Sequence, residues 1–157
     1  MVDNRSGYTS EASTVTPQQN LSELMTVSAG FVDVFKIRCA NQAIIVLPQN
    51  LILSVQTHQK GIKQIQWHDV ALPIYAVHGS EAKDVIALII ENEQVEQRFA
   101  ILCDDMPEAH RLRISEVVDV YGIEKEVGVF QYVRIHQELC QIPLLHEIYT
   151  KITKDRT

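Results

Sequence analysis

The chain has 157 residues, 46% of them hydrophobic, and a formal net charge of −6 at pH 7. This is the size of one domain with enough apolar residues for a packed core, which excludes a chain that is disordered throughout. The 14 Lys and Arg residues are scattered, so nucleic acid is not an expected partner, because phosphate binding needs basic side chains gathered on one surface.

Neither a membrane span nor a secretory signal is predicted. No apolar run approaches the roughly 18 residues that a spanning helix needs, and the first residues, "MVDNRSGYTSEAS", contain no apolar stretch. The cysteines Cys39, Cys103 and Cys140 are widely spaced in apolar surroundings. They are typical of small buried residues in a reducing compartment rather than of disulfides. We therefore expect a cytoplasmic protein without membrane insertion.

The first part of the chain shows no hydrophobic period. Up to about residue 20 it is rich in Ser, Thr, Asn and Gln, a composition that cannot bury enough apolar surface to order itself. We predict that residues 1–29 form a disordered tail and that residues 30–157 form the folded domain.

From Phe31 onward the chain is rich in short β-like runs. These are "FVDVFKIRC", "AIIVLP", "NLILSVQTH" and "VALPIYAVH", all with β-branched or aromatic residues. Pro48 and Pro73 lack an N–H for a ladder, so each should mark an edge or a break.

The clearest predicted element is a hairpin. Two runs, Val85 to Ile90 and Val95 to Cys103, flank the turn-like "ENEQ". The stretches "RLRISEVVDV" and "VFQYVRIHQELCQIP" predict further short strands. Asp104 and Asp105 precede Met-Pro and are interpreted as a turn.

The last element predicts an amphipathic helix. In "PLLHEIYTKITKD" the apolar residues Leu144, Leu145, Ile148 and Ile152 fall at helical spacing. Pro143 is predicted at the first helical position, and basic residues follow in the last turn. Many short strands and one terminal helix indicate a mostly β protein built from small barrels.

The sequence contains only weak motifs for catalysis, metal binding or phosphate binding. No Gly-rich phosphate loop, Cys-x-x-Cys or His-Glu-x-x-His occurs. His136 and Glu138 would share a face if "IHQEL" were a strand, which suits two metal ligands, but a solvated strand face explains the same residues. We expect no metal, no cofactor and no enzymatic activity. The alternative of a hydrolase using cysteine or histidine would require His68 or His136.

The order of the runs resembles the CheW-like domain, the coupling module of bacterial chemosensory systems. Four stretches between Phe31 and Ile152 carry the similarity: "VFKIRCANQAIIVLPQNLILSV", "ALPIYAV", "VIALIIENEQVEQRFAILCDDM" and "IPLLHEI". They match, in order, the family's opening strands, its apolar Pro-Ile stretch, its strand-turn-strand hairpin, and its last strand with the closing helix.

The resemblance implies a fold and a role. The fold is two packed five-stranded β-barrels, similar to Src-homology-3 barrels, with a C-terminal α-helix. The role is a non-catalytic adaptor that couples methyl-accepting chemoreceptors to a CheA-type histidine kinase, in chemotaxis or in twitching motility driven by type IV pili. Such domains bind partners through barrel surfaces and the groove between the barrels.

The resemblance also implies which residues contact partners. They are Val55 and Thr57 on one strand, with Trp67, His68 and Asp69 before the Pro-Ile run. The family has Asn-Leu-Arg-Gly in that last place, so its arginine becomes His68 and its glycine Asp69. Because histidine is mostly neutral near pH 7, either the partner differs or binding is weaker.

Trp67, the only tryptophan, is expected to be buried, in the core or under a partner, whereas His68 and Asp69 are expected to form an exposed turn. The alternative function is a β-barrel protein that binds a small ligand in the groove between its barrels, or a regulatory protein that has lost kinase coupling.

Overall fold

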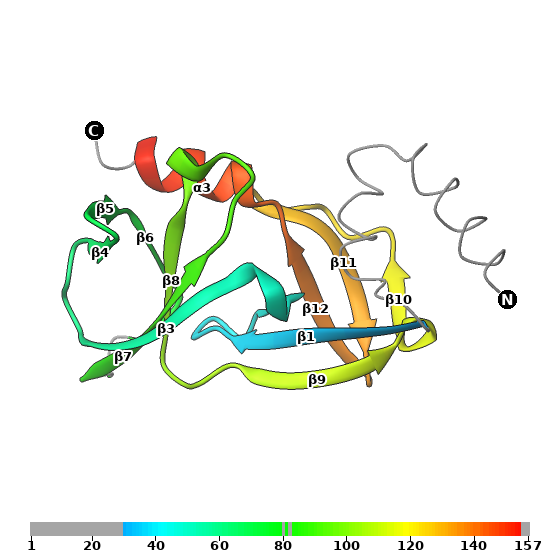
Figure 1. Cartoon of the computed structure of the whole chain (residues 1–157). Coiled ribbons are helices and arrows are strands. Elements are labelled where there is room, and N and C mark those ends of the chain that lie inside the picture. The colour runs from blue at the N-terminus through cyan, green and yellow to red at the C-terminus, as the bar shows by residue number, and fades with distance from the viewer. Residues whose placement is uncertain (1–29, 80, 82, 155–157) are drawn as a thin grey trace, which may run out of the picture.

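The computed structural model describes residues 30–79, 81 and 83–154, so the predicted tail at 1–29 lies outside the described residues. Within these ranges the chain forms twelve strands and one α-helix (Figure 1). The mostly β class with a closing C-terminal helix is therefore confirmed. The strands are β1 (Phe31–Arg38), β2 (Ile44–Pro48), β3 (Ile52–Gln59), β4 (Ile65–Trp67), β5 (Val70–Leu72), β6 (Ile74–Ala76), β7 (Asp84–Ile90), β8 (Phe99–Cys103), β9 (Glu108–Arg113), β10 (Val117–Val120), β11 (Val129–Ile135) and β12 (Glu138–Pro143), followed by α3 (Leu145–Lys154).

Two sheets divide the chain in an interleaved way. The first two strands and the last four form a six-stranded sheet in the order β10-β11-β12-β2-β1-β9, which is curled (Figure 1). The middle strands form a four-stranded sheet in the order β3-β7-β8-β6, together with the separate hairpin β4-β5. The chain thus leaves the curled sheet after β2, builds the four-stranded sheet, and returns at β9.

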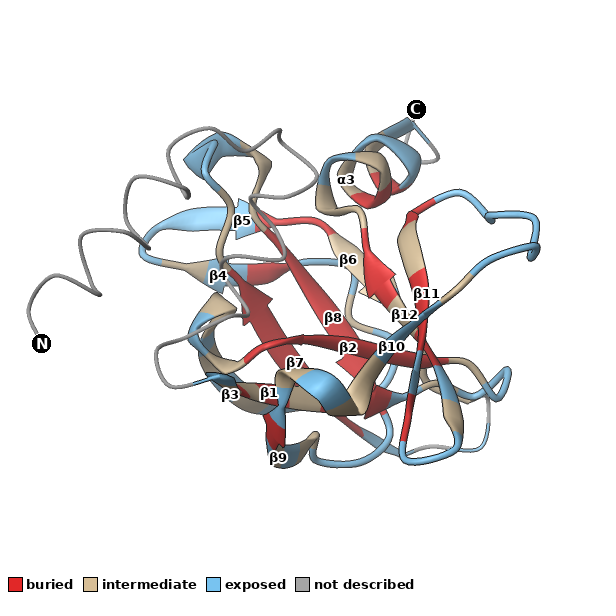
Figure 2. Cartoon of the chain, turned by 90° about the vertical axis from the view of Figure 1, so that its right-hand side faces the viewer, coloured by how far each residue is buried: buried red, intermediate tan, exposed pale blue. Residues whose placement is uncertain are grey.

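Three apolar cores hold these layers together. The first lies inside the curl of the six-stranded sheet and includes Val34 and Val133. The second joins the two sheets and the helix through residues such as Leu47 and Phe99. The third covers the other face of the four-stranded sheet, where the β4-β5 hairpin contributes Ile65. Figure 2 shows the buried strands that run through the centre of the molecule.

Strand alternation explains why several runs are apolar at every position. In β2, Ile44 and Val46 point into the curl, whereas Ile45 and Leu47 point into the core between the sheets. Because successive side chains of a strand point to opposite faces, a strand buried on both faces shows no polar alternation. β7 and β8 divide their side chains in the same way between the second and third cores.

Both prolines interrupt the ladders as predicted. Pro48 is the last residue of β2, and the 3-10 turn Gln49–Leu51 follows it. Pro73 separates β5 from β6, and its carbonyl oxygen accepts a hydrogen bond from Ala100 N at 3.0 Å. A missing N–H is therefore placed where the ladder ends.

The predicted hairpin is confirmed, although its second strand is shorter. β7 pairs with β8 in antiparallel register, but Val95–Gln97 forms a 3-10 turn and the strand begins only at Phe99. The stretch "RLRISEVVDV" is likewise broken, with the 3-10 turn Ile114–Glu116 between β9 and β10.

The stretch "IHQEL", considered as a possible strand with two metal ligands on one face, is not a single strand. His136 and Gln137 have φ angles of 49° and 70° and form the two-residue turn between β11 and β12. Two positive φ angles are the signature of a type I′ turn, whose twist suits a tight hairpin. His136 and Glu138 therefore do not share a strand face.

The helix begins later than predicted, because Pro143 ends β12 and α3 starts at Leu145. Its buried residues are Ile148 and Ile152, which join the core between the sheets. The loop before β11 holds the helix start, since Gly128 N donates to a Glu147 carboxylate oxygen at 2.8 Å. Gly128 has φ 92°, and a Cβ there would lie 2.9 Å from Ile148, so glycine permits this close approach.

Among the described residues, no helix combines the length and apolar character needed to cross a membrane.

Candidate functional site

One face of the edge strand β3 exposes apolar side chains. Leu53 and Val55 are 36% and 41% exposed, and Thr57 is exposed as well. Val55 lies opposite Leu88 and Thr57 opposite Ile86 in the ladder with β7. Since directly opposed residues point to the same side of a sheet, these two side chains lie on the face that carries the core between the sheets. Val55 and Thr57 lie at the edge of that core, where their side chains stay exposed.

The β4-β5 hairpin carries the other predicted contact residues. Trp67 is half-buried and packs on the core over the opposite face of the four-stranded sheet. His68 and Asp69 are exposed, have φ angles of 47° and 67°, and form a two-residue turn. The predicted exposed turn is therefore confirmed, and Trp67 is only partly covered. Its ring meets the His68 ring edge-on, with centroids 4.3 Å apart.

The structure thus separates the five predicted residues into two groups. We call Val55 and Thr57, together with the exposed Leu53 of the same strand, the β3 face. We call Trp67, His68 and Asp69 the hairpin tip. The β3 face belongs to one side of the four-stranded sheet, and the hairpin covers the other side. The sequence could not reveal this division, because it depends on which side of the sheet each core covers.

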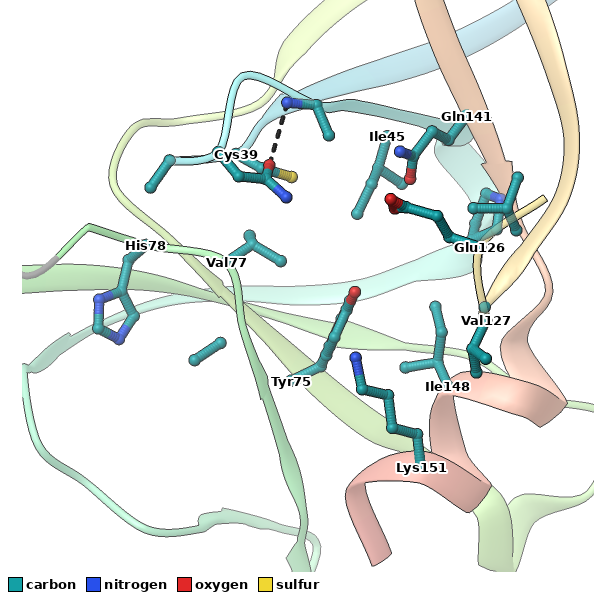
Figure 3. A pocket seen from close by; sticks show the side chains of 17 residues that line it. Cys39, Ile45, Tyr75, Val77, His78, Glu126, Val127, Gln141, Ile148 and Lys151 are labelled. Carbon is teal, nitrogen blue, oxygen red and sulfur yellow. Dashed lines mark hydrogen bonds between the residues drawn. The ribbon is translucent and has the colours of Figure 1, made fainter. Parts of the chain in front are cut away.

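A cleft of about 440 Å³ lies between the two sheets and the helix (Figure 3). Its wall comes from the β1-β2 turn, the β6 segment, the loop before β11, β12 and α3. Figure 3 shows the Glu126 carboxylate, the Gln141 amide and the Tyr75 hydroxyl directed into this space. The sequence resemblance implies a groove between two β units, but the sequence did not reveal which residues line this cleft, because they are far apart along the chain.

Electrostatics in the cleft are set by partial burial. Burial, with nearby Cys39 and Glu126, raises the pKa of the Tyr75 hydroxyl. Burial also raises the pKa of the Cys39 thiol to about 11, so this thiol stays protonated at neutral pH. The Lys151 ammonium lies 5.9 Å from the centroid of the Tyr75 ring, within the range of a cation–π contact.

An ion cluster lies at one end of the curled sheet. Lys36 is only 3% exposed, and its amine donates to Glu138 at 2.9 Å. Arg38 forms salt bridges to both Glu138 and Glu108. Hydrogen bonds from Arg38 and Lys36 lower the pKa of Glu138 to about 2. The cluster therefore links β1, β9 and β12 by charge.

Lys36 was missed at the level of sequence, although a signal was present. Lys36 follows Val32 and Val34 at alternate positions of β1, and those valines point into the curl. A lysine in that series is predicted to be inside, and a buried lysine needs an acidic partner. The partner, Glu138, is 102 residues away in the chain.

The three thiols show no activation. Each donates to a backbone carbonyl oxygen, Cys39 to Ile37, Cys103 to Asp105 and Cys140 to Glu138. Burial raises the pKa of Cys103 to about 12. The thiolate is the reactive form of cysteine, and these environments disfavour it.

The histidines and acids considered as ligands lie in other contacts. His136 Nε2 meets a Glu116 oxygen at 2.6 Å, whereas Glu138 pairs with Lys36 and Arg38. Within the described ranges, no three His, Cys, Asp or Glu side chains are arranged to hold a metal ion.

No protein-family model matches the chain, and no curated protein matches its sequence.

Proposed function

We propose that the chain is a CheW-like adaptor that couples chemoreceptors to a CheA-type histidine kinase through protein contacts. The observation that carries this proposal is the interleaved chain order. One β unit is made of the first two and last four strands, the other of the middle strands, and a helix closes the fold. This order agrees with the paired barrels that the sequence resemblance implies.

Each unit has features of a small barrel. β9 and β10 stand at opposite ends of the six-stranded sheet, yet only the 3-10 turn Ile114–Glu116 separates them in the chain. So short a connection places the end of β9 near the start of β10, which favours a curl of the sheet around its own core. In the other unit, the β4-β5 hairpin packs over the third core.

The backbone at the hairpin tip also supports the resemblance. Asp69 stands where the family has glycine, and its φ angle is 67°. Glycine adopts this left-handed conformation without strain, while most other residues do not. The turn therefore has the backbone shape for which the family's glycine is suited.

The two separated groups of residues suit a coupling role. A protein that links a receptor to a kinase needs two surfaces that bind at the same time, and the β3 face and the hairpin tip lie on opposite sides of one sheet. The β3 face offers apolar contact on a strand without Asp, Glu, Lys or Arg. The hairpin tip offers the ring of Trp67, and tryptophan is common at interface centres.

A binding experiment tests the proposal. The full chain is titrated with the kinase and, separately, with receptor signalling tips encoded in the same genome. Val55→Glu places a charge on the β3 face and should lower the affinity for one partner by at least about tenfold, or about 1.4 kcal/mol. Asp69→Lys should lower the affinity for the other partner, because the two surfaces are separate.

A matched control comes from the curled sheet. Val118 on β10 is 55% exposed, against 41% for Val55, so Val118→Glu adds the same charge to another exposed valine and should leave both affinities unchanged. Absence of binding to either partner at micromolar concentration would remove the adaptor role and leave the fold intact.

A further inference from the structure

The cleft between the sheets brings groups of opposite charge to one space. Lys151 enters it from α3, and Glu126 enters from the loop before β11. In the part of the chain that the structure describes, neither side chain forms a salt bridge. A ligand would therefore not have to break an internal ion pair to reach either charge.

Neutral groups complete the lining. The Gln141 amide and the Tyr75 hydroxyl face the same space as the Glu126 carboxylate (Figure 3). Aliphatic wall comes from Val77 and Ile148, which also line the cleft. A volume of about 440 Å³ falls within the range of small-molecule sites, which combine apolar walls with a few placed polar groups.

The two charges restrict the ligand. A simple anion would be attracted to Lys151 and repelled by Glu126. A simple cation would be attracted to Glu126 and repelled by Lys151. Like charges brought close together oppose binding, whereas a ligand that carries both signs satisfies both groups. The aliphatic wall favours an apolar portion between or beside the charged ends.

We propose that this cleft binds a small zwitterion of the amino-acid or dipeptide class. The ligand carboxylate lies at the Lys151 ammonium, its ammonium lies at the Glu126 carboxylate, and its aliphatic part packs on Val77 and Ile148. The Gln141 amide and the Tyr75 hydroxyl supply further hydrogen bonds. This site is separate from the β3 face and the hairpin tip.

Calorimetric titration of the full chain tests the site. The probes are L-leucine and glycyl-L-leucine, each compared with analogues that carry a single charge: N-acetyl-L-leucine, which lacks the ammonium, and L-leucinamide, which lacks the carboxylate. At least one zwitterion should bind, and each single-charge analogue of leucine should bind at least about tenfold more weakly than the zwitterion.

Two variants assign the ends of the ligand. Lys151→Met should weaken zwitterion binding and abolish the preference for leucine over leucinamide. Glu126→Gln should weaken binding and abolish the preference for leucine over N-acetyl-leucine. The matched controls are Lys154→Met and Glu124→Gln, which change a charge on the same helix and in the same loop but do not line the cleft. Both controls should bind as the unchanged protein does.

The proposal is overturned if neither zwitterion binds at millimolar concentration, or if Lys151→Met and Glu126→Gln bind them as the unchanged protein does. Far-UV circular dichroism shows whether each variant is folded. The outcome is independent of the adaptor role: Val55→Glu should lose partner binding and keep zwitterion binding. Lost partner binding and lost ligand binding are thus separate results.

Discussion

Among single residues, Lys36 is the one whose environment is most demanding. Its side chain is 3% exposed inside the curled sheet, and Glu138 supplies its countercharge at 2.9 Å. A buried ammonium without a partner would be strongly destabilising, so the pair matters more for what its loss would leave behind than for its net attraction. Arg38 extends the pair to Glu108 and so ties three strands at one end of the sheet.

The Glu138 carboxylate predicts an acid dependence of stability. Its pKa falls from an ordinary 4.5 to about 2 in the folded protein. Because the folded pKa is depressed, the contribution is fully present above pH 4.5 and is lost as the pH falls toward 2. Glu138 is 35% exposed, so solvent screening limits the contribution to about 1 kcal/mol.

Glu138→Gln should therefore lower the free energy of unfolding by at least about 1 kcal/mol at pH 7, since the buried Lys36 ammonium also loses its countercharge. It should also flatten the decline of stability between pH 4.5 and 2. Urea denaturation at a series of pH values measures both effects. Glu124→Gln, in an exposed loop, is the control and should change neither. An unchanged pH profile in Glu138→Gln would contradict this role of the carboxylate.

Among the elements, the two tight hairpins share an unusual feature. Both turns, His68-Asp69 and His136-Gln137, have positive φ angles at two residues that are not glycine. Type I′ turns favour Asn-Gly, because these residues tolerate the left-handed region. The turns therefore store backbone strain that the packed strands on either side hold in place.

Replacing the hairpin tip with Asn-Gly, as His68→Asn with Asp69→Gly, should raise the free energy of unfolding by about 0.5–1 kcal/mol. Thermal unfolding measures the gain. The same exchange at His136-Gln137 should gain less, because it removes the 2.6 Å contact of His136 with Glu116. Equal gains at both turns would mean that this contact contributes nothing.

For the whole molecule, the core between the sheets decides whether the two β units behave as one. It contains side chains from β1, β2, β7, β8 and α3 in a single cluster. Neither sheet can therefore unfold without exposing apolar surface of the other, which favours a single cooperative transition.

This coupling predicts that a destabilising substitution in one sheet also lowers the denaturation midpoint of the other. Val133 is fully buried inside the curl and belongs to the first core alone. Val133→Ala should cost about 2 kcal/mol through its cavity. Fluorescence of Trp67, which reports on the β4-β5 hairpin, should shift its denaturation midpoint together with the far-UV circular dichroism of the whole chain. A fluorescence midpoint that stays in place would show that the units unfold separately.

Local patterns predicted much of the fold. The β-like runs, the breaks at Pro48 and Pro73 and the apolar face of the helix all follow from effects within a few residues. Such effects are legible in sequence, because the missing N–H of proline and the helical spacing of apolar residues act locally. The turn at His136 and Gln137 was not predicted, because the pair lacks the Asn-Gly or Asp-Gly sequence that usually marks a turn with two positive φ angles.

The same reasoning predicted only part of the candidate site. His68 and Asp69 were correctly predicted as an exposed turn, but their separation from Val55 and Thr57 was not predicted. The lining of the cleft and the ion cluster were missed, because each joins segments from distant parts of the chain.

The sequence by itself therefore determined the secondary-structure class, the closing helix and which runs are buried, since these depend on chain stiffness, hydrogen-bonding groups and local apolar spacing. The tertiary structure decided which face of each strand meets which core, that Lys36 pairs with Glu138, and that Lys151 and Glu126 enter one cleft. The physical reason is that burial and charge pairing depend on distances through space, which are fixed only when residues far apart in the chain are brought together.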